Sequence, residues 1–158
     1  MKKHTSSGRN ILIGLLAILG LSALGGGGAL ILSPSGKLIG GLPLAMLQNS
    51  PFTDFFVPGI ILFMVLGVAP LSLIISLLKK NELKFFDWVN CFNDMHWAWT
   101  FSIYIAFALI IWIQTEMLMI SSIHWSHALY TGLAVLIIFV ALLPQVRNLY
   151  RKSNHYTP

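Results

Sequence analysis

The sequence predicts an all-α membrane protein: a four-transmembrane-helix bundle formed by a single integral membrane domain over residues 1–158. Of the 158 residues, 56% are hydrophobic and only 9% are charged, whereas a soluble domain usually carries about 25% charged residues. Because so few charges cannot cover a surface that faces water, we expect lipid to be the main solvent of the chain. Four apolar runs reach the length of about 20 residues that a bilayer core about 30 Å thick requires: approximately 11–32, 55–78, 97–120 and 125–145.

The positions of the basic residues predict how the four spans are oriented. Cytoplasmic segments of membrane proteins are enriched in Lys and Arg. Nine of the ten basic residues fall before the first span, between the second and third, or after the fourth: Lys2, Lys3, Arg9, Lys79, Lys80, Lys84, Arg147, Arg151 and Lys152. Only Lys37 lies in a segment on the other side. We therefore expect both termini to be cytoplasmic. Basic residues that flank apolar runs suit anionic lipid headgroups better than nucleic acid.

The first run begins after MKKHTSSGR, a start that fits a retained signal anchor or a secretory signal peptide. The apolar stretch is too long for a signal peptide, and no small-x-small cleavage site closes it before the glycines, which favours the anchor. Gly25–Gly28, with Ser22 and Ala23, form a zone of small residues. Such residues let helix backbones approach closely in a membrane. The alternative is a helix broken at the four glycines to line a pathway.

The first outer loop, SPSGKLIGGLPLAMLQNSPFTD, is long and apolar but too short to span the membrane. We expect it to lie on the outer surface or to dip back into the membrane, as an apolar cap between helices 1 and 2. At its end, Ser50 and Pro51 suit the first turn of a helix. Asp54 would then lie near the helix N-terminus, where a negative charge is favoured, and Pro58 would bend the helix further in.

The other two connections differ in length. The cytoplasmic segment between the second and third spans places four apolar side chains at helical spacing, which predicts a short helix lying in the interface: Phe85, Trp88, Val89 and Phe92. The turn before His124 is very short, so the third and fourth spans should form an antiparallel hairpin.

Four titratable side chains are predicted to lie at the same depth on the outer side: Asp54, Glu116, His124 and His127. Glu116 is the one carboxylate inside a predicted span, and it lies about 28 Å along the helix from Trp97, close to the outer interface. The two histidines are three residues apart and share a helical face. Such a set can bind Zn²⁺ or another divalent ion, or pass protons. The structural alternative is that Glu116 pairs with a histidine while the other groups face water.

Other kinds of chemistry have little support in the sequence. Cys91 is the only cysteine, so the sequence contains no CxxC pair and allows no intrachain disulfide or zinc-thiolate cluster. The sequence contains no HExxH, GxSxG, phosphate-loop or dinucleotide-binding motif. We therefore expect no catalytic residues and no cofactor. The expected partners are membrane lipids, with a partner membrane protein or further copies of the chain as additional partners, and no nucleic acid.

Two stretches carry a resemblance to a known family. They are GGGALILSPSGKLIGGLPLAMLQNSPFTDFFVPGIIL, residues 26–62, and WIQTE, residues 112–116. In this region the chain resembles a family of small, uncharacterised four-span bacterial membrane proteins in which an SPFxDFxVPG motif opens the second helix. The cytoplasmic segment KFFDWVNCFNDMH is longer and more aromatic than in that pattern. The resemblance implies the bacterial plasma (inner) membrane and brings no activity with it.

Three functional hypotheses follow from the sequence. The leading one is a non-enzymatic integral membrane protein that acts through packing with lipids or a partner protein. The second is a small transporter or ion-conducting oligomer that uses the outer Glu/His/Asp cluster, and the third is an intramembrane enzyme acting on lipid at the outer face. A transporter needs polar groups through the midplane, whereas the polar side chains of the spans lie mostly toward the cytoplasmic side: Ser72, Thr100, Ser102 and Tyr104.

Overall fold

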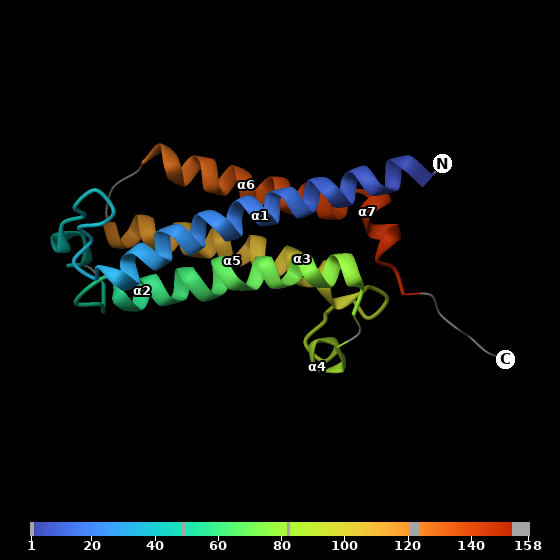
Figure 1. Ribbon diagram of the computed structural model, residues 1–158, viewed down its shortest axis with the longest axis horizontal. Helices are drawn as coiled ribbons and strands as arrows, with labels where there is room; N and C mark the ends of the chain where they lie inside the picture. The colour runs from blue at the N-terminus through green and yellow to red at the C-terminus, as the bar shows by residue number, and fades with distance from the viewer. Residues whose placement is uncertain (1, 49, 82, 121–123, 153–158) are drawn as a thin grey trace.

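The computed structural model describes residues 2–48, 50–81, 83–120 and 124–152, which fold into a bundle of four long helical rods (Figure 1). The rods are α1 (Lys2–Leu32), a second rod built from α2 (Phe56–Ile61), the π-helical η2 (Leu62–Val68) and α3 (Ala69–Lys79), then α5 (Trp97–Ile120) and α6 (Trp125–Leu142). Three short helices complete the described chain: the 3₁₀ helix η1 (Leu44–Leu47), α4 (Lys84–Asp87) and α7 (Pro144–Leu149).

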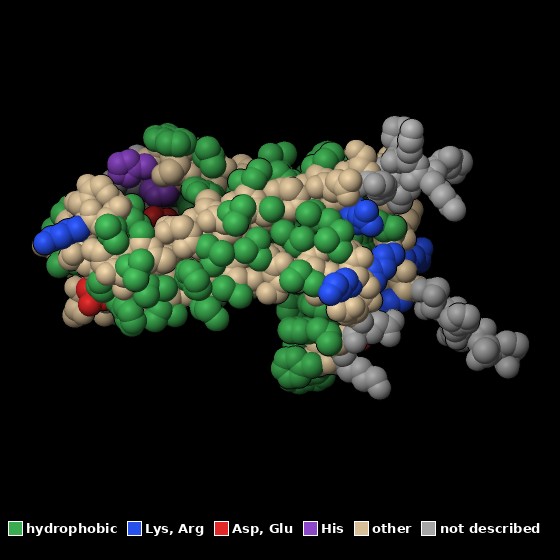
Figure 2. Space-filling view, in the orientation of Figure 1, with side chains coloured by type: hydrophobic (Ala, Val, Ile, Leu, Met, Phe, Trp, Pro, Cys, Tyr) green, Lys and Arg blue, Asp and Glu red, His purple; other side chains and the backbone are tan. Residues whose placement is uncertain are grey.

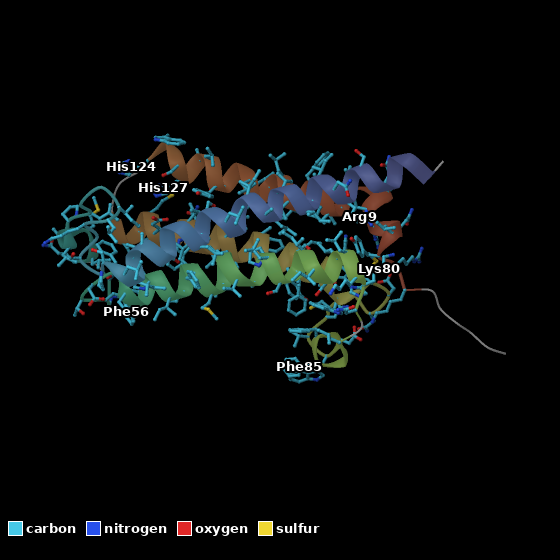
Figure 3. All side chains as sticks on the ribbon, viewed as in Figure 1. Arg9, Phe56, Lys80, Phe85, His124 and His127 are labelled. Carbon is cyan, nitrogen blue, oxygen red and sulfur yellow. The ribbon has the colours of Figure 1, made fainter. Side chains whose placement is uncertain are left out.

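The bundle has two distinct ends. One end, here called the loop end, carries residues 33–55 with η1. The other, here called the terminal end, carries the start of α1, α4, α7 and the last described residues (Figure 1). Figure 3 shows Arg9 and Lys80 toward the terminal end, with His124 and His127 at the loop end.

The prediction of four membrane-spanning helices in an all-helical chain is confirmed. The helices Ser7–Leu32, Phe56–Lys79, Trp97–Met119 and Trp125–Leu142 are each long and apolar enough to cross a membrane. Within the most apolar window of each, 33% of the residues are buried inside the bundle. The remaining residues are mostly apolar and face outward, so the bundle needs apolar surroundings to be stable.

The fourth span is shorter than predicted, because α6 ends at Leu142 and not at Gln145. Leu143 takes an extended conformation with ψ of 133°, as expected for a residue that precedes a proline. Pro144 then begins α7, in a position where a missing N–H costs nothing. The new helix buries Val146 at the terminal end.

A close backbone contact joins α1 to the second rod. A Cβ atom added at Gly27 would lie 2.7 Å from the backbone nitrogen of Phe63 and 2.9 Å from the carbonyl oxygen of Gly59. A Cβ atom added at Gly59 would lie 3.2 Å from the carbonyl oxygen of Gly27. No side chain larger than hydrogen fits between the two backbones at this point. The predicted role of the small-residue zone in helix packing is confirmed for Gly27, whereas Gly25 has nothing within 4 Å.

A second pair of glycines extends this contact toward the terminal end. A Cβ atom at Gly20 would lie 2.8 Å from the Leu71 side chain, and one at Gly67 would lie 2.8 Å from the Leu24 side chain. The helix α1 runs without interruption from Lys2 to Leu32. The alternative of a helix broken at the glycines is therefore wrong.

The second rod starts later than predicted, at Phe56. Ser50 does not begin a helix: its Oγ donates to the Leu47 carbonyl at 2.9 Å, at the end of η1. Asp54 lies just before the helix and accepts a hydrogen bond from the Phe56 N–H at 2.9 Å. Pro58 was predicted to bend the helix further in, but it falls in the first turn of α2, where no N–H is needed.

The irregular part of the second rod lies further on, at the π-helical segment η2. It ends two residues before Pro70, which occupies the first turn of α3. A proline ring clashes with the carbonyl group four residues earlier, which here belongs to Leu66. The backbone widens in this segment, and the Ala69 N–H bonds to Met64, five residues back.

The terminal end is closed by the segment that follows α3. Thr100 donates to the Asn90 side-chain oxygen at 2.6 Å, and the Asn90 amide donates to the Met95 carbonyl at 2.8 Å. The predicted interfacial helix is limited to the single turn α4. Phe86 stacks on Trp97 with ring centroids 4.5 Å apart and ties this turn to the bundle. Three aromatic side chains of this segment are exposed: Phe85, Trp88 and Phe92.

His96 connects the end of this segment to the start of α5. Its backbone N–H donates to the Tyr150 carbonyl at 2.8 Å, and its Nδ1 accepts from the Ala98 N–H at 3.2 Å. The residue is only 7% exposed, and its Nε2 makes no hydrogen bond to another residue that the structure describes. Burial lowers the pKa of His96 below its ordinary value of 6.5, against the opposing effect of the Lys80 and Asn81 carbonyls.

The two glycines at 25 and 27 allow a matched test of the close contact. Gly27→Ala should destabilise the protein by about 1–3 kcal/mol, because the added methyl meets backbone atoms. Gly25→Ala should leave stability unchanged or raise it by up to about 1 kcal/mol through helix propensity. Unfolding of the purified proteins by sodium dodecyl sulfate in mixed micelles measures both. Equal stability of the two variants would contradict the contact.

The buried histidine predicts a dependence of stability on pH. Because the folded-state pKa of His96 lies below the unfolded value of 6.5, its contribution is complete above that value and is lost as the pH falls through it toward the folded pKa. His96→Gln should reduce the loss of thermal stability between neutral and acidic pH. A His96→Gln profile identical to that of the unaltered protein would refute this assignment.

Candidate functional site

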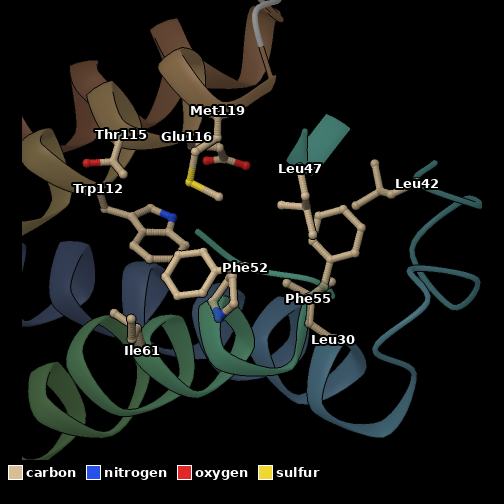
Figure 4. Close-up of a pocket in the computed structure, with 11 residues that line it drawn as sticks. Leu30, Leu42, Leu47, Phe52, Phe55, Ile61, Trp112, Thr115, Glu116 and Met119 are labelled. Atoms are coloured by element: carbon tan, nitrogen blue, oxygen red, sulfur yellow. The ribbon is translucent and has the colours of Figure 1, made fainter. Parts of the chain in front are cut away.

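The loop end contains an apolar cavity of about 280 Å³ between α5, the second rod and the loop. Figure 4 shows Glu116 and Trp112 of α5 facing Phe52 and Phe55 of the loop across this space. The lining is apolar apart from one hydroxyl, one carboxylate and one indole N–H: Leu30, Leu42, Leu47, Phe52, Phe55, Pro58, Ile61, Trp112, Thr115, Glu116 and Met119.

Two further hollows adjoin this cavity. One, of about 260 Å³, shares Trp112 and Glu116 with it and reaches toward α1 and Tyr130 of α6. The other, of about 210 Å³, shares Ile61, Trp112 and Thr115 and continues along α5 as far as Ala108. Eight residues separate Glu116 from Ala108, which corresponds to about 12 Å along the helix axis. The space therefore extends from the loop end along the side of the bundle.

Helical spacing on α5 places the key side chains together. Trp112 and Glu116 are four residues apart, so both lie on the face that looks toward the loop. Thr115 also lines the cavity, but its hydroxyl donates to the Ile111 carbonyl of its own helix at 2.9 Å. The Glu116 carboxylate and the Trp112 indole N–H are consequently the polar groups on this wall that make no side-chain hydrogen bond to another described residue.

The loop forms the opposite wall because two of its apolar side chains pack onto α1. Leu47 and Phe55 are buried against Leu30 in a small core separate from that of the bundle. The Phe55 N–H donates to the Pro34 carbonyl at 3.0 Å, which ties the two ends of the loop together. The loop is thus held over the bundle by burial and by its own hydrogen bonds.

Among the described residues that line the three hollows, Glu116 alone is charged. Within residues 2–48, 50–81, 83–120 and 124–152, its carboxylate makes no hydrogen bond and no ion pair. His124 and His127 lie close enough for charges on their rings to act on it. Glu116 is therefore near the two histidines, but the predicted pairing is not seen as a hydrogen bond or an ion pair among the described residues.

His127 is held at the start of α6 by a local hydrogen bond. It is 5% exposed, and its Nδ1 accepts a hydrogen bond from the His124 backbone N–H at 3.2 Å. This bond fixes the orientation of the ring at the loop end.

The structure does not bring the four predicted metal candidates together. In the part of the chain that the structure describes, no three His, Cys, Asp or Glu side chains lie close enough to hold a metal ion. Asp54 instead bonds to the start of the second rod. Its carboxylate is thus explained by the local fold.

The sequence reasoning found Glu116 but missed the residues that surround it. Trp112 could have been found, since it stands one helical turn before Glu116 on the same face. Phe52, Phe55 and Leu47 could not, because their place depends on how a loop without regular periodicity folds over the bundle.

Comparison with known protein families, curated proteins and solved structures finds no significant match to the chain. The fold and the site therefore define its class by themselves. It is an all-helical protein with four helices able to span a membrane, and with an apolar cavity at one end that contains a single carboxylate.

The bond from Asp54 to the second rod predicts different outcomes for two substitutions. Asp54→Asn keeps an acceptor oxygen for the Phe56 N–H and should change stability little. Asp54→Ala removes the acceptor and should cost about 0.5–1.5 kcal/mol. Thermal unfolding in detergent measures both. A loss in the asparagine variant as large as that in the alanine variant would show that the charge of Asp54, and not its hydrogen bond, matters.

Proposed function

We propose that this chain is a non-enzymatic integral membrane protein of a bacterial plasma membrane, with both termini in the cytoplasm, and that it acts by binding lipid or a partner membrane protein. The observation that carries the proposal is the apolar cavity at the loop end, which adjoins the lipid-facing surface of the spans. The bacterial membrane is supported by the sequence resemblance around SPFTDFFVPG.

The distribution of charge supports the orientation. The basic side chains visible in Figure 2 gather toward the terminal end, with one at the loop end. A cytoplasmic terminal end satisfies the preference of Lys and Arg for that side. The loop end, with its cavity, then faces the outer side of the membrane.

Hydrogen bonding within the spans supports a binding role over conduction. Ser22, Ser72 and Ser102 each donate to a carbonyl of their own helix, at 3.0, 2.9 and 2.9 Å. Their hydroxyls are thus occupied and do not form a chain of free polar groups through the bundle. The alternative of a small transporter that uses Glu116 and the histidines has less support, because an ion path would have to cross this apolar middle.

The surface of the spans supports contact with lipid or with another membrane protein. Large apolar side chains are exposed along α5 and α6: Phe107, Ile111, Leu129, Val135, Leu136 and Phe139. Lipid tails or a partner helix cover such a surface without cost.

The single cysteine permits a direct test of orientation. Cys91 is exposed at the terminal end, so a membrane-impermeant maleimide should not label it in intact spheroplasts but should label it after lysis. Ser35→Cys in a Cys91→Ser background places the thiol in the loop and should be labelled before lysis. The opposite pattern would show that the loop end is cytoplasmic.

Co-purification tests the binding role. Native mass spectrometry of the protein in a mild detergent should show retained phospholipid or a retained membrane protein. A divalent metal at one per chain that is lost in the His124→Ala/His127→Ala variant would overturn the proposal in favour of metal chemistry.

A further inference from the structure

We propose that the loop-end cavity binds a cationic amphiphile, with its ammonium group against Glu116 and its alkyl chain along α5. The inference deepens the proposed function and rests on it in one respect: it takes the loop end to be in contact with membrane lipid.

Charge complementarity sets the headgroup. A carboxylate among apolar side chains is costly without a counter-charge. Glu116 makes no ion pair with another described residue, and only His124 and His127 lie near enough for a charge to act on it. An ammonium ion supplies that counter-charge. The rings of Trp112, Phe52 and Phe55 line the same cavity and offer additional cation–π attraction. An anionic headgroup would instead place two like charges together.

The shape of the hollow sets the rest of the molecule. Past Trp112, the space that continues from the cavity is lined by Ile61, Val65, Leu66, Ala108 and Ile111, all apolar. The hydroxyl of Thr115, also in this lining, is bonded to its own helix. An extended alkyl chain fits an apolar lining that follows α5 for about 12 Å from Glu116 to Ala108, whereas a second polar group there would stay unsatisfied.

The position of the hollow gives the ligand a route from the membrane. Val65 of η2 and Ile111 of α5 line its far part and are 42% and 66% exposed on the side of the bundle. The hollow is therefore reached from the lipid-facing surface between these two rods. An amphiphile already in the bilayer can enter sideways and does not have to cross the loop.

Two sources share this chemistry: an aminophospholipid of the membrane and a free long-chain ammonium compound. Both combine a positive nitrogen with a long apolar chain, but in the aminophospholipid a phosphate and glycerol ester groups stand between the two. They differ in whether a phosphate accompanies the ammonium group, and this difference separates them experimentally.

The test measures binding of three probes of equal chain length to the purified full-length protein in a neutral maltoside detergent. We expect dodecyltrimethylammonium to bind, and to raise the melting temperature, more than dodecanol or dodecanoate. Glu116→Gln should weaken binding of the ammonium probe about tenfold or more while leaving dodecanol unaffected. Asp54→Asn, which removes the other carboxylate of the loop end, should bind like the unaltered protein.

A second variant and a lipid comparison complete the design. Phe52→Leu keeps the site apolar but removes a ring, and should weaken ammonium binding several-fold with no change for dodecanol. In nanodiscs, retention of phosphatidylethanolamine over phosphatidylglycerol would identify an aminophospholipid, and equal retention alongside tight dodecyltrimethylammonium binding would identify a free ammonium compound.

The inference is overturned if dodecanol or dodecanoate binds as tightly as the ammonium probe, or if Glu116→Gln, with unchanged helix content by circular dichroism, binds it equally well. These results would leave the proposed function standing, since apolar lipid could still occupy the cavity. A failure of the proposed function would instead show in the co-purification and labelling experiments.

Discussion

The backbone contact between Gly27 of α1 and Gly59 of the second rod is the constraint on which the rest of the bundle depends. In a membrane, lipid tails are as apolar as leucine, so helices associate through close packing rather than through hydrophobic burial. The two glycines give the closest packing possible, and Gly20 with Gly67 continue it along the same pair of rods. Elsewhere larger side chains lie between the rods, such as Trp112 of α5, which lines the hollows toward α1 and the second rod. The space those side chains leave at the loop end is the cavity around Glu116.

The same lack of water makes polar groups within the spans informative. Serine hydroxyls bond to their own helices, and at the terminal end Asn90 and Thr100 satisfy each other. Glu116 differs, since it faces apolar hollows with no bonded partner in the described chain. The apolar surroundings of Glu116 therefore mark it as a candidate functional residue more clearly than its position within a span does. The hydrogen bonds and basic side chains of the terminal end indicate a structural role, in which this segment closes the end of the bundle.

The sequence was sufficient to predict the features that depend only on local properties of the chain. Length and apolarity define a span without reference to its neighbours, so all four spans were found. The end of the fourth was misplaced, although the rule for residues before a proline would have put a boundary at Leu143.

Gly25 and Gly27 look alike in the sequence, and only the packing shows that one is in contact and the other is not. Ser50 and Pro51 resemble a helix start, yet the burial of Leu47 and Phe55 draws them into the loop instead. The four titratable residues were predicted at one depth, but depth does not fix position around the bundle, and Asp54 lies apart from a metal-binding arrangement with the others.

The packing of the loop onto α5 is the central element of this account, and cross-linking in native membranes tests it most directly. Leu47→Cys in η1 and Met119→Cys in α5, introduced together in a Cys91→Ser background, place two thiols in the cavity lining on the two elements that should meet there (Figure 4). A short bismaleimide should join them within one chain, while Leu47→Cys paired with Leu142→Cys, at the far end of α6, should give no product. A cross-link absent from the first pair, or equally abundant in both, would contradict the cavity and everything inferred from it.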